Sequence, residues 1–377
     1  MATLKNIKWK HYINYIAIAI VTIVFGAMSF GNALPFSTIN LLEKMSISII
    51  LAVSLSMVVG FLGELSLGHA GFMCVGAYLG GKVSTVLEPI LGNGILTLII
   101  SIIVGGLVAA VFGVIIGLPA LRLKGDYLAI VTLAFGEIVR TVFMNSSDES
   151  FGGSLGLSTP RYDKKYLFII AFVLVLACLA VIQNLIRSKH GRAITSIRDN
   201  EIAAHATGIN VTKYKLSVFT ISSLFAGIAG VLYSYSNYTV QSTNFDYNYS
   251  IEILVMVVLG GMGSINGAII AATLITYLDT TLQTVLTGNL AVLQDLFYAL
   301  ILIVLVIYNN APALKSFRAT HNLSVFFDKF RKHDPSKHRD DEAKWDRVPT
   351  KIEMNEVLSV DLQPSSSTVN PDKKEGK

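Results

Sequence analysis

The chain has 377 residues, a formal net charge of +5 and a mean hydropathy of +0.59; 53% of its residues are apolar and only 15% are charged. Soluble domains usually carry about 25% charged residues, so this composition excludes a soluble enzyme and indicates a membrane protein. Because a helix satisfies its own backbone hydrogen bonds in hydrocarbon, we expect an all-α, polytopic bundle in contact with lipid. No nucleic-acid partner is expected.

Nine apolar runs are long enough to cross a hydrocarbon core about 30 Å thick. Allowing for uncertain ends, they predict a bundle of about 8–10 spans. The short run 251–260 cannot span as a helix, so we expect either a re-entrant half-helix or one arm of a broken span there. The nine runs cover residues 12–30, 45–65, 70–87, 94–118, 127–144, 166–186, 216–235, 267–286 and 290–308.

Basic residues predict which loops face the cytoplasm, where Lys and Arg are enriched. They lie in the N-terminal segment 1–11, at Arg122 and Lys124 after the fourth run, and throughout the loop 187–215. We therefore expect this side of the bundle, and both termini, to be cytoplasmic.

The composition divides the chain into a short N-terminal segment, a transmembrane domain at 12–308 and a tail at 309–377. The tail carries thirteen Lys or Arg and eleven Asp or Glu residues, so it is predicted to be largely disordered and cytoplasmic. A basic amphipathic helix over 315–332 on the membrane surface is the alternative for its first part.

The loop 187–215 contains a short helix that another protein is expected to hold. Asp199 or Asn200 can cap it, Glu201 lies where the helix dipole favours an anion, and Gly208 ends it in the left-handed conformation. A helix of about two turns is marginal alone, which favours a docking role. Its strong helix formers are Ala203, Ala204 and Ala206.

Two glycine-rich segments, 60–71 and 259–267, interrupt apolar runs and resemble each other weakly. Unwound backbone at membrane depth is tolerated where it lines a cavity, so paired breaks of this kind point to a transporter's substrate pathway. Close helix packing through glycine is the alternative. The pathway residues predicted on this basis are Glu64, Ser66, Gly68, His69, Gly260, Gly261, Gly263 and Ser264.

Motifs for catalysis fail on inspection. The segment Gly76–Val83 comes within one residue of a phosphate-binding loop, but Val83 stands where Ser or Thr must hold magnesium, and no strand precedes it. No His, Cys or carboxylate cluster has metal-ligand spacing. We therefore predict no enzyme activity, no metal site and no cofactor bound by this chain.

Several strings resemble a known family. Ala203-Ala204-x3-Gly208 is similar to the EAA loop of ABC importer permeases, and its surroundings, GRAITSIRDNEIAAHATGIN at 191–210, look like the LivM-type permease of branched-chain amino acid importers. The strings LSLGHA at 65–70, GLPALRLKGDYLAIVTL at 117–133 and VLGGMGS at 258–264 are also similar to that family. The Ile-x-Leu-Pro of the general importer pattern is absent after Gly208, and the tail is longer than expected for the family.

The resemblance implies a permease subunit that works with a second homologous permease, two cytoplasmic ATPases that use ATP and magnesium, and an external or periplasmic binding protein. It places the chain in a prokaryotic plasma membrane, the inner membrane of a Gram-negative cell. It also implies an apolar amino acid as substrate. The ATPases would contact Arg198, Glu201, Ala203, Ala204 and Gly208.

Three alternatives stay open at this point. Within ABC importers, urea or short-chain amides are rival substrates. An ion-coupled secondary transporter would use Glu64, His69 or Glu252 as its relay, and a membrane scaffold or receptor would act through the tail.

Overall fold

The computed structural model describes residues 13–31, 34–92, 94–123, 125–160 and 162–285, with isolated positions at 296, 299, 300, 303 and 307. The long helices are α1 (Ile13–Phe30), α2 (Phe36–Ser56), α3 (His69–Leu91), α4 (Ile95–Ala120), α5 (Asp126–Met144), α7 (Lys164–Arg187), α10 (Val211–Asn237) and α12 (Ile265–Val285). The shorter helices are the π-helical turn η2 (Met57–Leu62), α6 (Asp148–Phe151), η3 (Gly153–Leu155), α8 (Lys189–Asp199), α9 (Glu201–Ala206), η4 (Ser242–Asn244) and α11 (Tyr247–Gly260).

The predicted all-α membrane bundle is confirmed. Seven described helices are long and apolar enough to cross a membrane: α2 together with η2, and α3, α4, α5, α7, α10 and α12. The first predicted run forms α1, a shorter apolar helix over its described residues Tyr15–Ser29. The run predicted at 290–308 and the tail lie outside the described residues, apart from isolated positions.

Helices α3, α4 and α10 form the tightest part of the bundle, and glycines let them approach each other. A Cβ atom added at Gly76 of α3 would collide with the backbone of Gly227 in α10, and one added at Gly105 of α4 would collide with the Val231 side chain. Small residues at a helix interface allow such close backbone contact. These glycines therefore pack helices and do not line a cavity.

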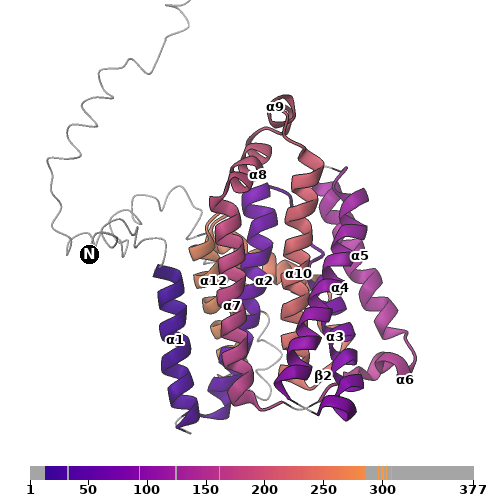
Figure 1. The fold of residues 1–377 in the computed structure, drawn as a ribbon, viewed down its shortest axis with the longest axis vertical. Coiled ribbons are helices and arrows are strands. Elements are labelled where there is room, and N and C mark those ends of the chain that lie inside the picture. The colour runs from indigo at the N-terminus through magenta and orange to yellow at the C-terminus, as the bar shows by residue number, and fades with distance from the viewer. Residues whose placement is uncertain are drawn as a thin grey trace, which may run out of the picture. The chain divides into compact units, whose positions relative to one another are not determined.

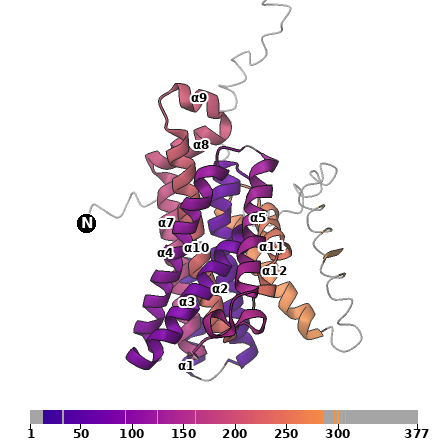
Figure 2. The same ribbon diagram turned by 90° about the vertical axis from the view of Figure 1, so that its right-hand side faces the viewer.

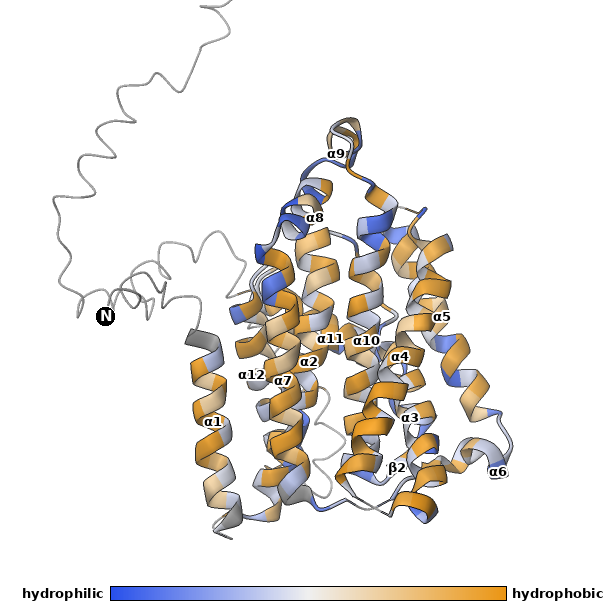
Figure 3. Cartoon of the chain, in the orientation of Figure 1, coloured by the Kyte–Doolittle hydropathy of each residue, from blue (hydrophilic) through white to orange (hydrophobic). Residues whose placement is uncertain are grey.

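The connecting segments gather at two ends of the bundle, which we call the α9 end and the β end. Helices α8 and α9 project at the top of Figure 1, whereas α6 and β2 lie at the bottom. At the β end, strand β1 (Leu157–Ser158) pairs antiparallel with β2 (Thr239–Val240) and joins the loops that follow α5 and α10. Figure 3 shows polar residues on α8 and on the segments flanking α9, above apolar spans.

Helix α11 is a short apolar helix that ends in a glycine turn. It has 14 residues, so it is about 21 Å long and falls short of a 30 Å core. It begins beside α5, where Glu137 Oε1 accepts a hydrogen bond of 3.0 Å from the Tyr247 backbone N–H. At Gly261 (φ +91°) the chain turns back into α12, and Figure 2 shows the two helices side by side. The sequence left open a re-entrant half-helix or one arm of a broken span; the structure shows a short helix that a glycine turn joins to α12.

Candidate functional site

The short helix predicted in the loop 187–215 is confirmed as α9. Asn200 caps it, because its Oδ1 accepts a hydrogen bond of 3.0 Å from the Ala203 backbone N–H. Gly208 (φ +85°) follows its last turn, and the N–H of Ile209 donates to the Ala204 carbonyl at 3.1 Å. Of the two cap candidates, Asp199 instead ends the preceding helix.

That preceding helix, α8, was not expected from the sequence. Its N-cap is Ser188, whose Oγ accepts hydrogen bonds from the N–H groups of His190 and Gly191. Ile194 and Ile197 are buried on its inner face. The signals were present as a capping serine followed by apolar residues three apart, but the high density of charge around them suggested an open loop.

Ala203 and Ala204 of α9 face in different directions. Ala204 is only 3% exposed and belongs to the core, so it packs α9 onto the protein and does not form an outer face. Ala203 and Ala206 are exposed, and Ile202 is 79% exposed. This corrects the prediction that Ala203 and Ala204 both contact a partner: the exposed residues of α9 are Ile202, Ala203, His205 and Ala206.

Lys215 of α10 joins α9 to the first glycine break. Its ammonium lies 2.5 Å from Glu64 Oε1 and 3.4 Å from Glu201 Oε2, and its side chain is only 3% exposed. Glu64 follows η2, and Glu201 begins α9. A buried cation requires anionic partners, so this ammonium holds two distant segments at one point. Lys215 is one of the basic residues of the loop 187–215, and its buried position was not predicted from the sequence.

Arg198 makes the second link. Its Nη1 donates a hydrogen bond of 3.2 Å to the carbonyl of Gly60 within η2, while Nε and Nη2 bond to Asp199 Oδ1 at 3.0 and 2.9 Å. Gly63 has a φ of +81°, and a Cβ there would lie 2.6 Å from Arg198 Cγ. Glycine at position 63 is therefore required both by the backbone conformation and by the arginine.

The two glycine breaks lie against each other. A Cβ added at Gly60 would collide with the backbone N of Gly263, so the first break touches the second. Within the second break, a Cβ added at Gly260 would collide with the backbone of Gly267. The irregular turns expected at both places are present, with left-handed Gly63 on one side and Gly261 and Gly263 on the other. Arg198 and Lys215 consequently act on a single backbone junction, which we call the glycine junction and define as residues 60–64 and 260–264.

Side-chain hydroxyls satisfy the buried start of α3. Thr132 Oγ1 accepts a hydrogen bond of 3.0 Å from the Leu67 N–H, and Ser250 Oγ accepts one of 3.2 Å from the Ala70 N–H. His69 is 2% exposed, and its Nε2 lies 2.9 Å from Ser54 Oγ. The donors of a helix N-terminus can bind an anion, but here protein oxygens already occupy two of the nearby amides.

The predicted pathway residues divide by exposure. Ser66, Gly68 and His69 are buried, whereas Ser264 is exposed. A cavity of about 280 Å³ opens at Gly263 and Ser264, where Gln183, Arg187 and Asn266 also line it. Ser66, Gly68 and His69 are therefore closed off in this conformation, whereas Phe61 of the first break and the second break border a polar cavity at the α9 end.

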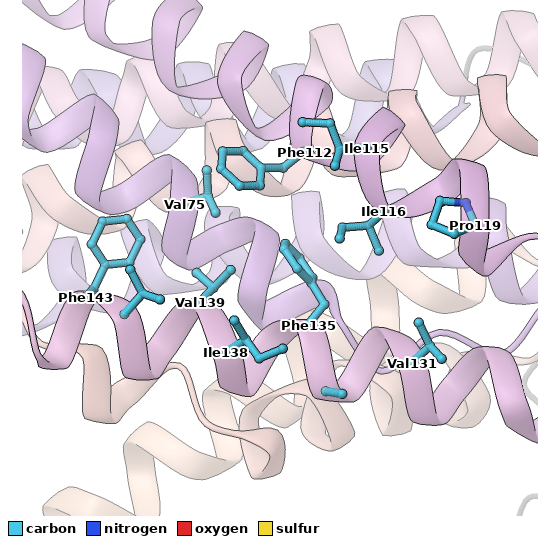
Figure 4. Close-up of a pocket in the computed structure, with 12 residues that line it drawn as sticks. Val75, Phe112, Ile115, Ile116, Pro119, Val131, Phe135, Ile138, Val139 and Phe143 are labelled. Carbon is cyan, nitrogen blue, oxygen red and sulfur yellow. The ribbon is translucent and has the colours of Figure 1, made fainter.

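A larger cavity, of about 450 Å³, lies between α4 and α5 and is lined by apolar side chains (Figure 4). Ile115 and Ile138 on its walls are 55% and 62% exposed. Pockets for polar ligands need a few convergent polar groups, which this groove lacks. It is suited to hydrocarbon and not to the charged groups of an amino acid.

Residues 37–308 match the family described as the permease component of branched-chain amino acid transport systems. The chain belongs to this permease family. It is a multi-pass membrane permease subunit of ABC importer type.

Curated relatives agree with this assignment. The high-affinity branched-chain amino acid transport system permease protein LivM of Salmonella typhimurium is 35% identical over 298 residues, covering 71% of this chain and 67% of that protein. LivM of Escherichia coli K12 is 34% identical over 287 residues, covering 68% and 66%. The ribose import permease RbsC of the same strain is 28% identical over 192 residues, covering 48% and 56%. No solved structure matches the chain at a significant level.

Replacing Lys215 with methionine tests the ion pairs that hold α9. Lys215→Met keeps the apolar stem but leaves Glu64 and Glu201 without their cation. Breaking a buried pair costs about 3–5 kcal/mol, and because the Glu201 side chain is 32% exposed we expect on the order of 2 kcal/mol here. Amide hydrogen exchange in α9 should then be roughly 30-fold faster.

Lys213→Met, at an exposed position of α10, the helix that also carries Lys215, is the matched control. It should leave amide hydrogen exchange in α9 unchanged. Equal exchange in the Lys215→Met variant and the wild type would show that the pairs do not hold α9.

Proposed function

We propose that this chain forms the translocation pathway of an ATP-driven importer for branched-chain or other apolar amino acids. Its partners are a second homologous permease, two cytoplasmic ATPases that bind ATP and magnesium, and an external substrate-binding protein. Family membership and the similarity to the LivM proteins support the substrate class. The permease itself supplies no nucleotide chemistry in this proposal.

One observation supports the coupling role most directly: two charged side chains tie the α8–α9 segment to the glycine junction, Lys215 through Glu201 of α9 and Arg198 from the end of α8. Lys215 holds Glu201 and Glu64 together, and Arg198 holds the Gly60 carbonyl. A protein that pulls on α9 therefore pulls on irregular backbone inside the bundle. This arrangement gives ATPase movement a short physical route to the pathway.

The proposed transport step follows from these contacts. ATPase closure displaces α9, and the two links pass the displacement to the glycine junction. Glycine turns change conformation at low steric cost, so α11 and α12 rock against η2 and the accessible side of the pathway alternates. In this scheme the role of Glu64 is to position the glycine junction through its ion pair with Lys215, and not to bind the substrate.

The same scheme fixes the orientation of the chain. The α9 end, which carries the basic residues of α8 and the start of α10, faces the cytoplasm and the ATPases. The β end faces outward, toward the binding protein. We place the chain in the plasma membrane of a prokaryote, the inner membrane where there are two.

A charge on the outward side of α9 tests ATPase docking. Ile202→Glu keeps the buried Ala204 and leaves Lys215 and Arg198 unchanged, but it places a carboxylate at a position of α9 that is 79% exposed. Because an apolar anchor at an interface is worth about 2 kcal/mol, we expect ATPase binding to weaken roughly 30-fold. Co-purification of ATPase subunits and leucine uptake by reconstituted importer should both fall.

Thr212→Glu, at an exposed position in the first turn of α10, is the control and should retain both ATPase binding and leucine uptake. Undiminished uptake by the Ile202→Glu importer would remove α9 from the coupling mechanism. Leucine uptake that persists without any ATPase subunit would favour an ion-coupled transporter instead.

Cysteines at the two breaks test the pathway itself. In a chain lacking Cys74 and Cys178, a cysteine replacing exposed Ser264 should react with a small water-soluble thiol reagent in the nucleotide-free importer. One replacing Ser66, which is 2% exposed, should be protected there. The Ser66→Cys variant should become reactive when ATP is trapped. Protection of both positions in every nucleotide state would mean that the glycines serve packing alone.

A further inference from the structure

A second polar cavity lies at the β end, remote from the glycine junction. Its volume is about 190 Å³, and its walls come from α2, α10, α11 and α12. Most of its lining side chains are polar, which is uncommon within apolar spans. None of the residues predicted for the pathway from the glycine pattern lines it.

The cavity brings together side chains of both charges. Lys44 of α2 contributes an ammonium, whereas Glu252 of α11 and Asp279 of α12 contribute carboxylates. Both carboxylates already have interaction partners, so a ligand would bind beside groups that are already paired. A free amino acid carries one ammonium and one carboxylate, which matches such a mixed site.

Thr276 supplies an independent sign of a ligand. It lines the cavity and is 6% exposed, yet its hydroxyl has no hydrogen-bond partner among the described residues. Buried hydroxyls are almost always hydrogen-bonded, so an orphan one calls for an explanation. A bound polar group in the cavity would satisfy it.

We propose that this cavity binds the α-ammonium and α-carboxylate groups of the amino acid as it enters from the binding protein. Glu252 and Asp279 receive the ammonium, and Lys44 receives the carboxylate. The inference rests on the proposed function, because it takes the substrate class from it. It also explains how a largely apolar bundle recognises a zwitterion. The ammonium and carboxylate of the amino acid meet side chains of opposite charge near the β end, before the amino acid moves toward the glycine junction.

Thiol protection tests binding directly. In assembled importer lacking Cys74 and Cys178, a Thr276→Cys variant is reacted with a small thiol reagent from the β end, with leucine as the probe. Leucine should slow the reaction several-fold, whereas 4-methylpentanoic acid and isopentylamine, which each keep only one charged group, should not. A cysteine replacing Leu155, which is 75% exposed at the same end, should react equally fast with and without leucine.

Uptake measurements give the second test. Glu252→Gln and Asp279→Asn should each lower the maximal rate of leucine uptake roughly tenfold, the loss expected for one charge-assisted hydrogen bond. ATP hydrolysis without leucine and co-purification of ATPases should stay at wild-type levels. Glu149→Gln, an exposed carboxylate of α6, should behave as wild type.

The outcomes separate the two proposals. If the wild-type importer takes up leucine but leucine does not protect Thr276→Cys, the cavity is not a substrate site and the proposed function stands. Protection by either single-charge analogue equal to that by leucine would also overturn the inference, because it would indicate a simple ion site. No leucine uptake by the wild-type importer would overturn the proposed function itself.

Discussion

A single buried ammonium organises the α9 end of this permease. Lys215 begins a long helix, but its charge is shared by Glu64, 151 residues earlier, and by Glu201 on the exposed helix α9. A cation that is 3% exposed needs its anions close by, and so the positions of α9 and of the first glycine break are not independent. A displacement of α9 is therefore transmitted to the first glycine break.

Glycine determines what that force can move. Gly60 and Gly263 touch backbone to backbone, so the ends of η2 and α11 form one junction where side chains have no room. By contrast, Gly76 and Gly227 pack continuous helices against each other. The same residue type therefore gives a rigid helix pair in one place and a turn that can rearrange in another, depending on whether the helices continue through the contact.

The spans and the ends of α9 can be predicted from the sequence, whereas the remaining features depend on tertiary contacts. Apolar runs predict the spans, and Asn200 and Gly208 predict the ends of α9 because capping is local chemistry. Ala204 was misassigned, since composition cannot tell which side of a two-turn helix packs inward. The role of Lys215 and the meeting of the two glycine breaks were also missed, because each joins residues more than a hundred positions apart. A single sequence does not indicate which distant residues are in contact.

The central claim is that α9 and the glycine junction move as one unit, and spin-label distances in the assembled importer test it. Labels at Thr207 and Met262 report within the unit, and labels at Met262 and Leu155 report its position relative to the β end; all three sites are exposed. The account predicts that trapping ATP leaves the first distance unchanged and shifts the second. A change in the first distance with no change in the second would mean that α9 moves without carrying the junction, which contradicts the account.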